Sequence, residues 1–86
     1  MASIDEVRSA IMVANERASQ SLGELQQAHS SLEQAQGALA QGTEGSNQAE
    51  AAEANGLLAQ AVNKVAEAQQ EVSAAIRAFE GVANRL

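Results

Sequence analysis

The sequence predicts an all-α protein folded as one antiparallel two-helix hairpin. Three observations support this: helix-forming Ala, Gln, Glu and Leu are abundant, apolar residues recur at alternating spacings of three and four, and a Gly-containing segment interrupts that pattern near residue 45. Pro and Cys are absent, and Phe79 is the only aromatic residue. Residues that favour strands are therefore scarce. We expect residues 1–86 to form a single domain.

The first predicted helix covers residues 3–41. Ser3 followed by Glu6 is typical of a capping box, in which the hydroxyl accepts a backbone N–H and the carboxylate reaches back to the cap. Asp5 suits the positive end of the helix dipole. Residues at three-four spacing then form a coiled-coil-like seam rich in Ala. This predicted seam contains Ile4, Val7, Ile11, Ala14, Ala18, Ser21, Leu25, Ala28, Leu32, Ala35 and Leu39.

Residues 42–46 are predicted to reverse the chain. Gly42 and Gly45 lie in this segment, and glycine takes positive φ at little cost. Antiparallel heptads can be paired only in steps of seven, and one such register centres the reversal on residue 45. Composition and register therefore place the turn in the same segment.

The second predicted helix covers residues 47–85. Asn47 with Glu50 repeats the capping box, and Arg85 lies in the last turn, where a cation suits the helix C-terminus. Asn55-Gly56 is its weakest point, so we expect a kink or local fraying there rather than a functional hinge. The predicted seam of this helix contains Ala51, Asn55, Leu58, Val62, Val65, Gln69, Val72, Ile76, Phe79, Ala83 and Leu86.

The predicted register places Ile11 opposite Phe79 and matches many large residues with Ala, which lets the two backbones approach closely without voids. One layer is polar, because Ser21 faces Gln69. We interpret this layer as a device that fixes the register rather than as a ligand contact.

Apolar residues also remain outside the seam, and we expect them to form a surface for a partner. They are Met12, Val13, Leu22, Leu57 and Val82. One flank of the second seam adds a row of small residues, Ala54, Ala61, Ala68 and Ala75. A seam with so many Ala layers buries little apolar area. The free energy gained by that burial has to offset the conformational entropy lost on folding. We therefore expect the hairpin to dimerise into a four-helix bundle or to bind another helical protein.

The formal net charge of -6, with only five Lys and Arg residues, disfavours nucleic acid as a partner. Between Ala18 and Asn63 the charged residues are all acidic: Glu24, Glu33, Glu44, Glu50 and Glu53. No apolar run is long enough for a membrane span or a signal peptide. We expect a cytoplasmic protein by default, with signal-independent export as the alternative.

The sequence offers little for catalysis or metal binding. His29 is the only imidazole, and with Glu33 one turn later it supplies two ligands where a metal site normally needs three or four. We expect His29 to bond to water or to Glu33, and only a symmetric dimer would bring two such pairs together. The Gly residues do not form a phosphate-binding loop, and we find no base placed to activate a Ser residue. We therefore expect no enzymatic activity, no cofactor and no small-molecule substrate.

The overall plan, an acidic chain of under a hundred residues with two long helices and a Gly-containing turn at its midpoint, resembles the small helical-hairpin substrates of type VII secretion. That family has a Trp-X-Gly turn and a C-terminal Tyr-X-X-X-Asp/Glu signal, and this chain has neither Trp nor Tyr. No functional residue is therefore transferred from the family. Segments 14–18 and 22–28 are also similar to short proteins of actinobacteria.

Two functions follow from these observations. The first is a non-enzymatic interaction module, a hairpin that pairs with itself or with another helical protein, with a role in type VII secretion implied by the resemblance. The alternative is a structural protein that assembles into filaments or layers, which is suggested by an acidic loop end opposite an end that carries Arg8, Arg17, Arg77 and Arg85. A third hypothesis, a polar helix former that folds only when dried or bound, has less support.

Overall fold

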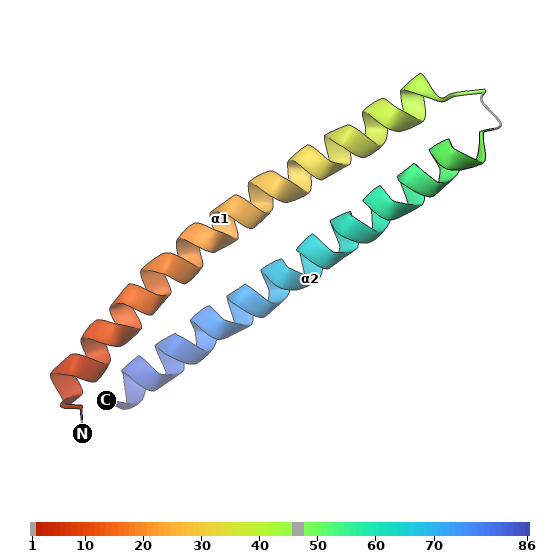
Figure 1. Ribbon diagram of the computed structural model, residues 1–86. Helices are drawn as coiled ribbons and strands as arrows, with labels where there is room; N and C mark the ends of the chain where they lie inside the picture. Colours follow the sequence, from red (N-terminus) through yellow and green to blue (C-terminus); the bar gives the residue numbers. More distant parts are fainter. Residues whose placement is uncertain (1, 46–47) are drawn as a thin grey trace.

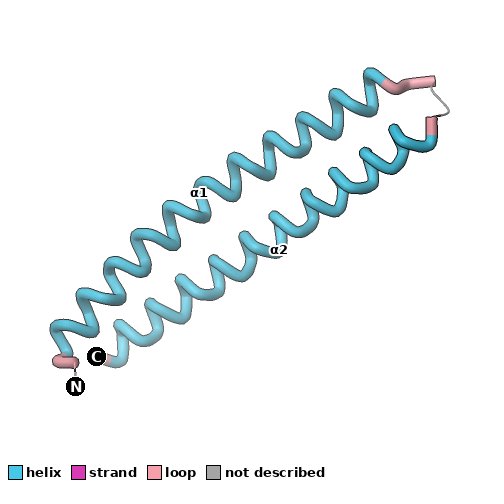
Figure 2. Tube along the Cα trace, viewed as in Figure 1, coloured by secondary structure: helices cyan, strands magenta, loops and turns pink. Residues whose placement is uncertain are grey.

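The computed structural model describes residues 2–45 and 48–86 and shows two long antiparallel helices. Helix α1 spans Ile4–Gly42 and helix α2 spans Ala49–Arg85. The helices lie side by side along their length, and both termini lie at the same end of the hairpin, which we call the open end (Figure 1). The described residues contain no strand (Figure 2). The predicted all-α hairpin is confirmed.

The start of α1 is fixed by its predicted cap. The Oγ atom of Ser3 accepts a hydrogen bond from the backbone N–H of Glu6 at 3.1 Å, and the carbonyl of Ser3 accepts one from Val7 at 3.0 Å. Asp5 and Glu6 both lie in the first turn, where the exposed N–H groups favour negative charge. Four residues therefore set where α1 begins.

Thr43 and Gly45 end α1 and begin the reversal. The backbone N–H of Thr43 bonds to the carbonyl of Leu39 at 3.0 Å, and its hydroxyl donates to the same oxygen at 2.7 Å. Gly45 has a φ of 80°, whereas Gly42 still belongs to the helix. Of the two glycines expected to allow the turn, Gly45 is thus the one that takes positive φ.

Helix α2 begins at Ala49, with Gln48 as its N-cap residue. Asn47, the predicted cap, lies outside the described residues. The helix continues through Asn55-Gly56 without interruption. At its other end the Nε atom of Arg85 donates to the carbonyl of Gly81 at 3.2 Å, which supports the last turn.

The contact between the helices is built from half-buried side chains, and no described residue is fully buried. On α2, every predicted seam position from Ala51 to Phe79 is half-buried. The flanking residues Ala54, Ala61, Ala68 and Ala75 are half-buried as well. Toward the open end the seam loses its cover, because Ile4 and Ala83 are exposed and Leu86 remains 39% exposed.

Helix α1 turns most of its predicted seam toward α2 and adds a neighbouring row that the sequence analysis did not assign to the seam. Ser21 and Ala35 are exposed, whereas Leu22 and Gln36, which follow them directly, are half-buried. The same half-buried row recurs every seven residues as Asn15, Leu22, His29, Gln36 and Thr43. The prediction that Leu22 lies on an outer partner surface is therefore wrong, and so is the placement of Ser21 and Ala35 in the seam.

Side-chain size and helix geometry explain why this additional row faces α2. After Val7 the predicted row holds only Ala and Ser, which bury little apolar area. The neighbouring row instead brings Leu22 and the carbon atoms of His29 and Gln36 toward α2. A straight α-helix also drifts by about 20° per heptad relative to a strict seven-residue frame. The neighbouring row therefore joins the predicted seam, in which Val7, Ala14 and Ala28 remain half-buried.

We expect Gly45→Ala to lower the free energy of unfolding by about 1 kcal/mol, because an L-residue disfavours the positive φ found there. The matched control is Gly37→Ala in the interior of α1, where an added Cβ meets open space. It should raise the free energy of unfolding by about 0.5 kcal/mol. Urea unfolding followed by circular dichroism measures both, and shifts of the same sign would contradict this account of the turn.

We expect Leu22→Ala to lower the free energy of unfolding by about 1–2 kcal/mol, a part of the loss measured for fully buried Leu. Met12→Ala is the control, because Met12 is 63% exposed and its truncation should change stability by less than about 0.5 kcal/mol. Thermal unfolding at one fixed protein concentration compares them. Equal effects of the two substitutions would place Leu22 outside the seam.

Candidate interaction surface

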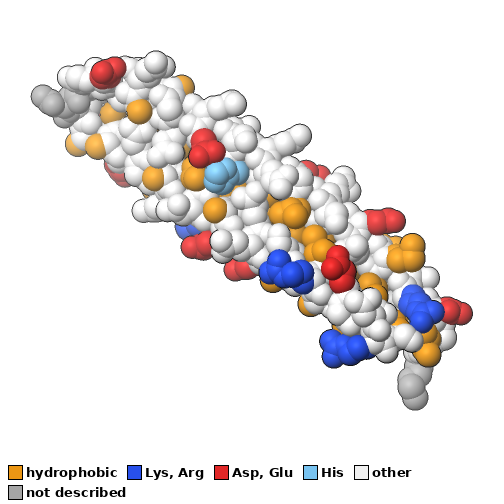
Figure 3. Space-filling view, turned by 180° about the vertical axis from the view of Figure 1, so that it is seen from behind, with side chains coloured by type: hydrophobic (Ala, Val, Ile, Leu, Met, Phe, Trp, Pro, Cys, Tyr) orange, Lys and Arg blue, Asp and Glu red, His pale blue; other side chains and the backbone are white. Residues whose placement is uncertain are grey.

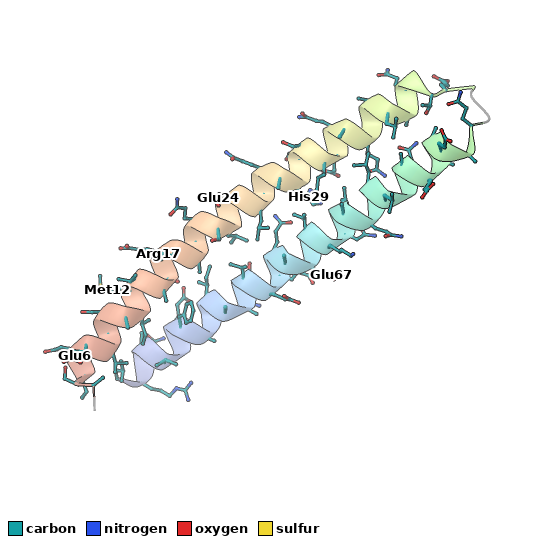
Figure 4. All side chains as sticks on the ribbon, in the orientation of Figure 1. Glu6, Met12, Arg17, Glu24, His29 and Glu67 are labelled. Carbon is teal, nitrogen blue, oxygen red and sulfur yellow. The ribbon has the colours of Figure 1, made fainter. Side chains whose placement is uncertain are left out.

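Four of the five residues predicted to form a partner surface are exposed: Met12, Val13, Leu57 and Val82. Met12 lies near the open end of α1 (Figure 4), and it is 63% exposed. Leu57 lies near the loop end of α2 and is 58% exposed. Apolar side chains of this size are thus accessible at both ends of the hairpin.

One side of α2 combines small and large apolar residues, and we call it the α2 flank. It consists of Ala54, Leu57, Ala61, Ala68, Ala75 and Val82. The four Ala residues and Val82 recur every seven residues, and Leu57 lies on the same side, one turn after Ala54. A second helix can approach such a surface closely, because Ala keeps the backbone accessible.

A shallow polar groove lies between the two helices. Leu22 and Gln26 line it from α1, and α2 contributes Ala66, Gln69, Gln70, Ser73 and Arg77. The groove brings residues 22–26 of α1 near residues 66–77 of α2, whereas the predicted register would place residues 64–68 opposite them. The predicted Ser21 and Gln69 layer is not formed in that way, because Ser21 is exposed and Leu22 takes its place beside Gln69.

His29 and Glu33 form a local pair on α1. The Nδ1 atom of His29 lies 3.2 Å from Oε1 of Glu33, one turn later, and Glu33 is largely exposed. Figure 4 shows His29 on the side of α1 that faces α2. Among residues 2–45 and 48–86, no group of three or more His, Cys, Asp and Glu residues is placed to hold a metal ion. His29 thus pairs with Glu33, one of the two partners that the sequence predicts for it.

Two amide oxygens in the seam are enclosed without a hydrogen-bond partner. They are the Oδ1 atoms of Asn15 and Asn55. Asn55 was assigned to the seam from the sequence, but Asn15 was not. Asn15 lies four residues after Ile11, a half-buried seam residue, and this spacing is the signal that could have identified it. Each unpaired oxygen lowers the stability of the contact between the helices.

Charge is divided unevenly along the hairpin. Figure 3 shows large basic side chains toward the end where the termini lie. The four Arg residues belong to this end, namely Arg8, Arg17, Arg77 and Arg85. Across the part of the chain that the structure describes, no Arg side chain pairs with a carboxylate of its own hairpin. They are available to a partner.

No described helical segment combines the length and the apolar character that crossing a membrane requires. Comparison with known families, with curated proteins and with solved structures finds no match to this chain. The chemistry of the surface itself is therefore the basis for a proposal on function.

We expect Asn55→Leu to raise the free energy of unfolding by about 1 kcal/mol or more, because it removes the unpaired oxygen and adds apolar area to the seam. Asn63→Leu, at an exposed position of α2, controls for helix propensity and should raise it by about 0.5 kcal/mol at most. Thermal unfolding of both variants gives the comparison. A gain no larger for Asn55→Leu than for Asn63→Leu would mean that the oxygen is satisfied in solution.

Proposed function

We propose that this protein is a non-enzymatic interaction module, a hairpin whose helices are completed by the helices of a partner, first of all a second copy. The supporting observation is the size of its exposed surface. The chain exposes 6319 Å², whereas a compact protein of 8.9 kDa exposes about 4,800 Å². The hairpin thus leaves roughly 1,500 Å² more surface accessible than a compact fold of its mass.

This excess is large enough for a stable interface. A typical specific interface buries about 800 Å² on each partner, and obligate dimers bury more. Two hairpins that pack face to face would cover each seam from a second side and form a four-helix bundle. The α2 flank supplies a surface that allows such close packing.

A role in type VII secretion is part of this proposal, and its support is architectural. Chain length, the two long helices and the midpoint turn resemble the hairpin substrates of that system. The proposal assigns no residue to export, because the chain has neither Trp nor Tyr for the two signature motifs of the family.

A structural assembly protein is the second candidate, and the charge distribution favours it. The loop end carries Glu33, Glu44, Glu50 and Glu53, and the opposite end carries the four Arg residues. Contacts from end to end between hairpins would join these opposite charges and would weaken as salt screens them. Electron microscopy at low and high salt distinguishes the candidates, because a closed dimer forms no filaments at either concentration.

We expect light scattering after gel filtration to give at least twice the chain mass of 8.9 kDa at micromolar concentration. Circular dichroism of the same fractions should show a highly helical protein. A well-folded helical monomer would contradict self-association, since it would show that the hairpin is stable with its seam covered on one side only.

A further inference from the structure

We propose that the partner is a second copy of this chain in antiparallel orientation, with the α2 flank of one hairpin packed against the α2 flank of the other. This inference rests on the proposed function and deepens it, because it specifies the occupant, the face and the direction. Three features of the described residues support it: the arrangement of large and small side chains on the flank, its charges, and the exposed area already described.

The largest residues of the α2 flank lie at its two ends. Val82 comes 25 residues after Leu57, which is close to seven full turns, so both side chains point to the same side of α2. They are separated by about 37 Å along the helix. Between them the flank presents Ala61, Ala68 and Ala75. The surface therefore has a large apolar side chain at each end and small residues between them, and Lys64, about five turns before Val82, lies on the same side.

Such a surface is complementary to its own antiparallel copy. In that orientation Leu57 meets the partner subunit's Val82, and the two-fold axis passes between residues 69 and 70. This point is close to the middle of α2, which spans Ala49–Arg85, so the two α2 helices overlap over nearly their whole length. In this register Ala61 faces the partner subunit's Ala78, whereas Ala68 and Ala75 face the partner subunit's Glu71 and Lys64, so each long charged side chain of the centre meets a small one.

The charges beside the flank favour the same direction. Lys64 and Glu71 are both exposed there. In the antiparallel pairing Lys64 lies one turn from the partner subunit's Glu71, and symmetry makes this contact twice. The pairing also places the acidic loop end of each copy beside the end of the other copy that carries Arg residues.

A parallel pairing has the opposite effect. It would bring two loop ends together, each with Glu33, Glu44, Glu50 and Glu53, although the chain has no Lys or Arg between Ala18 and Asn63. Like charges placed side by side oppose association, and here no cation is near to compensate them. It would also set Leu57 beside Leu57 of the partner subunit and leave the two ends of the flank unmatched.

Because the chain contains no Cys, single-cysteine variants report the orientation directly. Leu57→Cys and Val82→Cys replace exposed side chains, so folding should be retained, and circular dichroism checks this. Each variant is oxidised alone and as an equal mixture of the two. A disulfide requires Cα atoms within about 7 Å, so the mixture should form the mixed disulfide about tenfold faster than either variant forms its own dimer.

The control mixture combines Val82→Cys with Asn63→Cys, which is exposed on a different side of α2. It should form disulfides about tenfold more slowly than the Leu57→Cys and Val82→Cys mixture, because its sulfur atoms are too far apart in the proposed pairing. Rapid self-crosslinking of Leu57→Cys, or equal rates in both mixtures, would overturn the antiparallel flank pairing. Light scattering on the unoxidised samples separates this outcome from failure of the proposed function: a dimer with the wrong crosslinks refutes the pairing alone, whereas a folded monomer refutes both.

Discussion

The contact of two helices along a single seam is the constraint on which the rest of the structure depends. In a hairpin each seam residue is covered from one side only, and no described residue is fully buried as a result. The shape follows from the same constraint. The hairpin measures 63 × 18 × 15 Å, and its radius of gyration of 19.3 Å exceeds the value of about 12 Å expected for a compact chain of this length. The polar seam residues Asn15 and Asn55 further reduce what the contact between the helices contributes to stability. A surface left open in this way is the physical reason to expect a partner.

Side-chain size determines which surface stays open. Helix α1 turns Leu22 and its row toward α2 together with Ala14 and Ala28, because Ala and Ser alone bury little area. The polar groove lies beside that row, where Gln26, Gln70 and Arg77 keep it accessible to water. The α2 flank carries Leu57 and Val82, which remain exposed, and the exposed charged residues Lys64 and Glu71 lie beside them. An exposed apolar surface of this kind gains stability when another helix covers it.

The sequence predicts the elements better than their rotation. Strong local signals made the helices and the turn predictable: the cap at Ser3, the helix formers throughout, and the positive φ available to Gly45. Most of the exposed apolar residues could also be predicted from the period. The position of Leu22 in the seam could not be predicted, because most of its row is polar and a fixed seven-residue frame ignores the drift of a straight helix. No pattern in the chain indicated Asn15 as a seam residue while that frame was used.

The central claim is that the contact between α1 and α2 is insufficient by itself and that association completes it. Thermal unfolding by circular dichroism over a hundredfold range of protein concentration tests it most directly. If folding is coupled to association, the midpoint should rise by on the order of 5–10 °C across that range, and helicity should fall at the lowest concentration. A fully helical protein whose unfolding midpoint does not change with concentration would contradict the account, because two helices alone would then suffice.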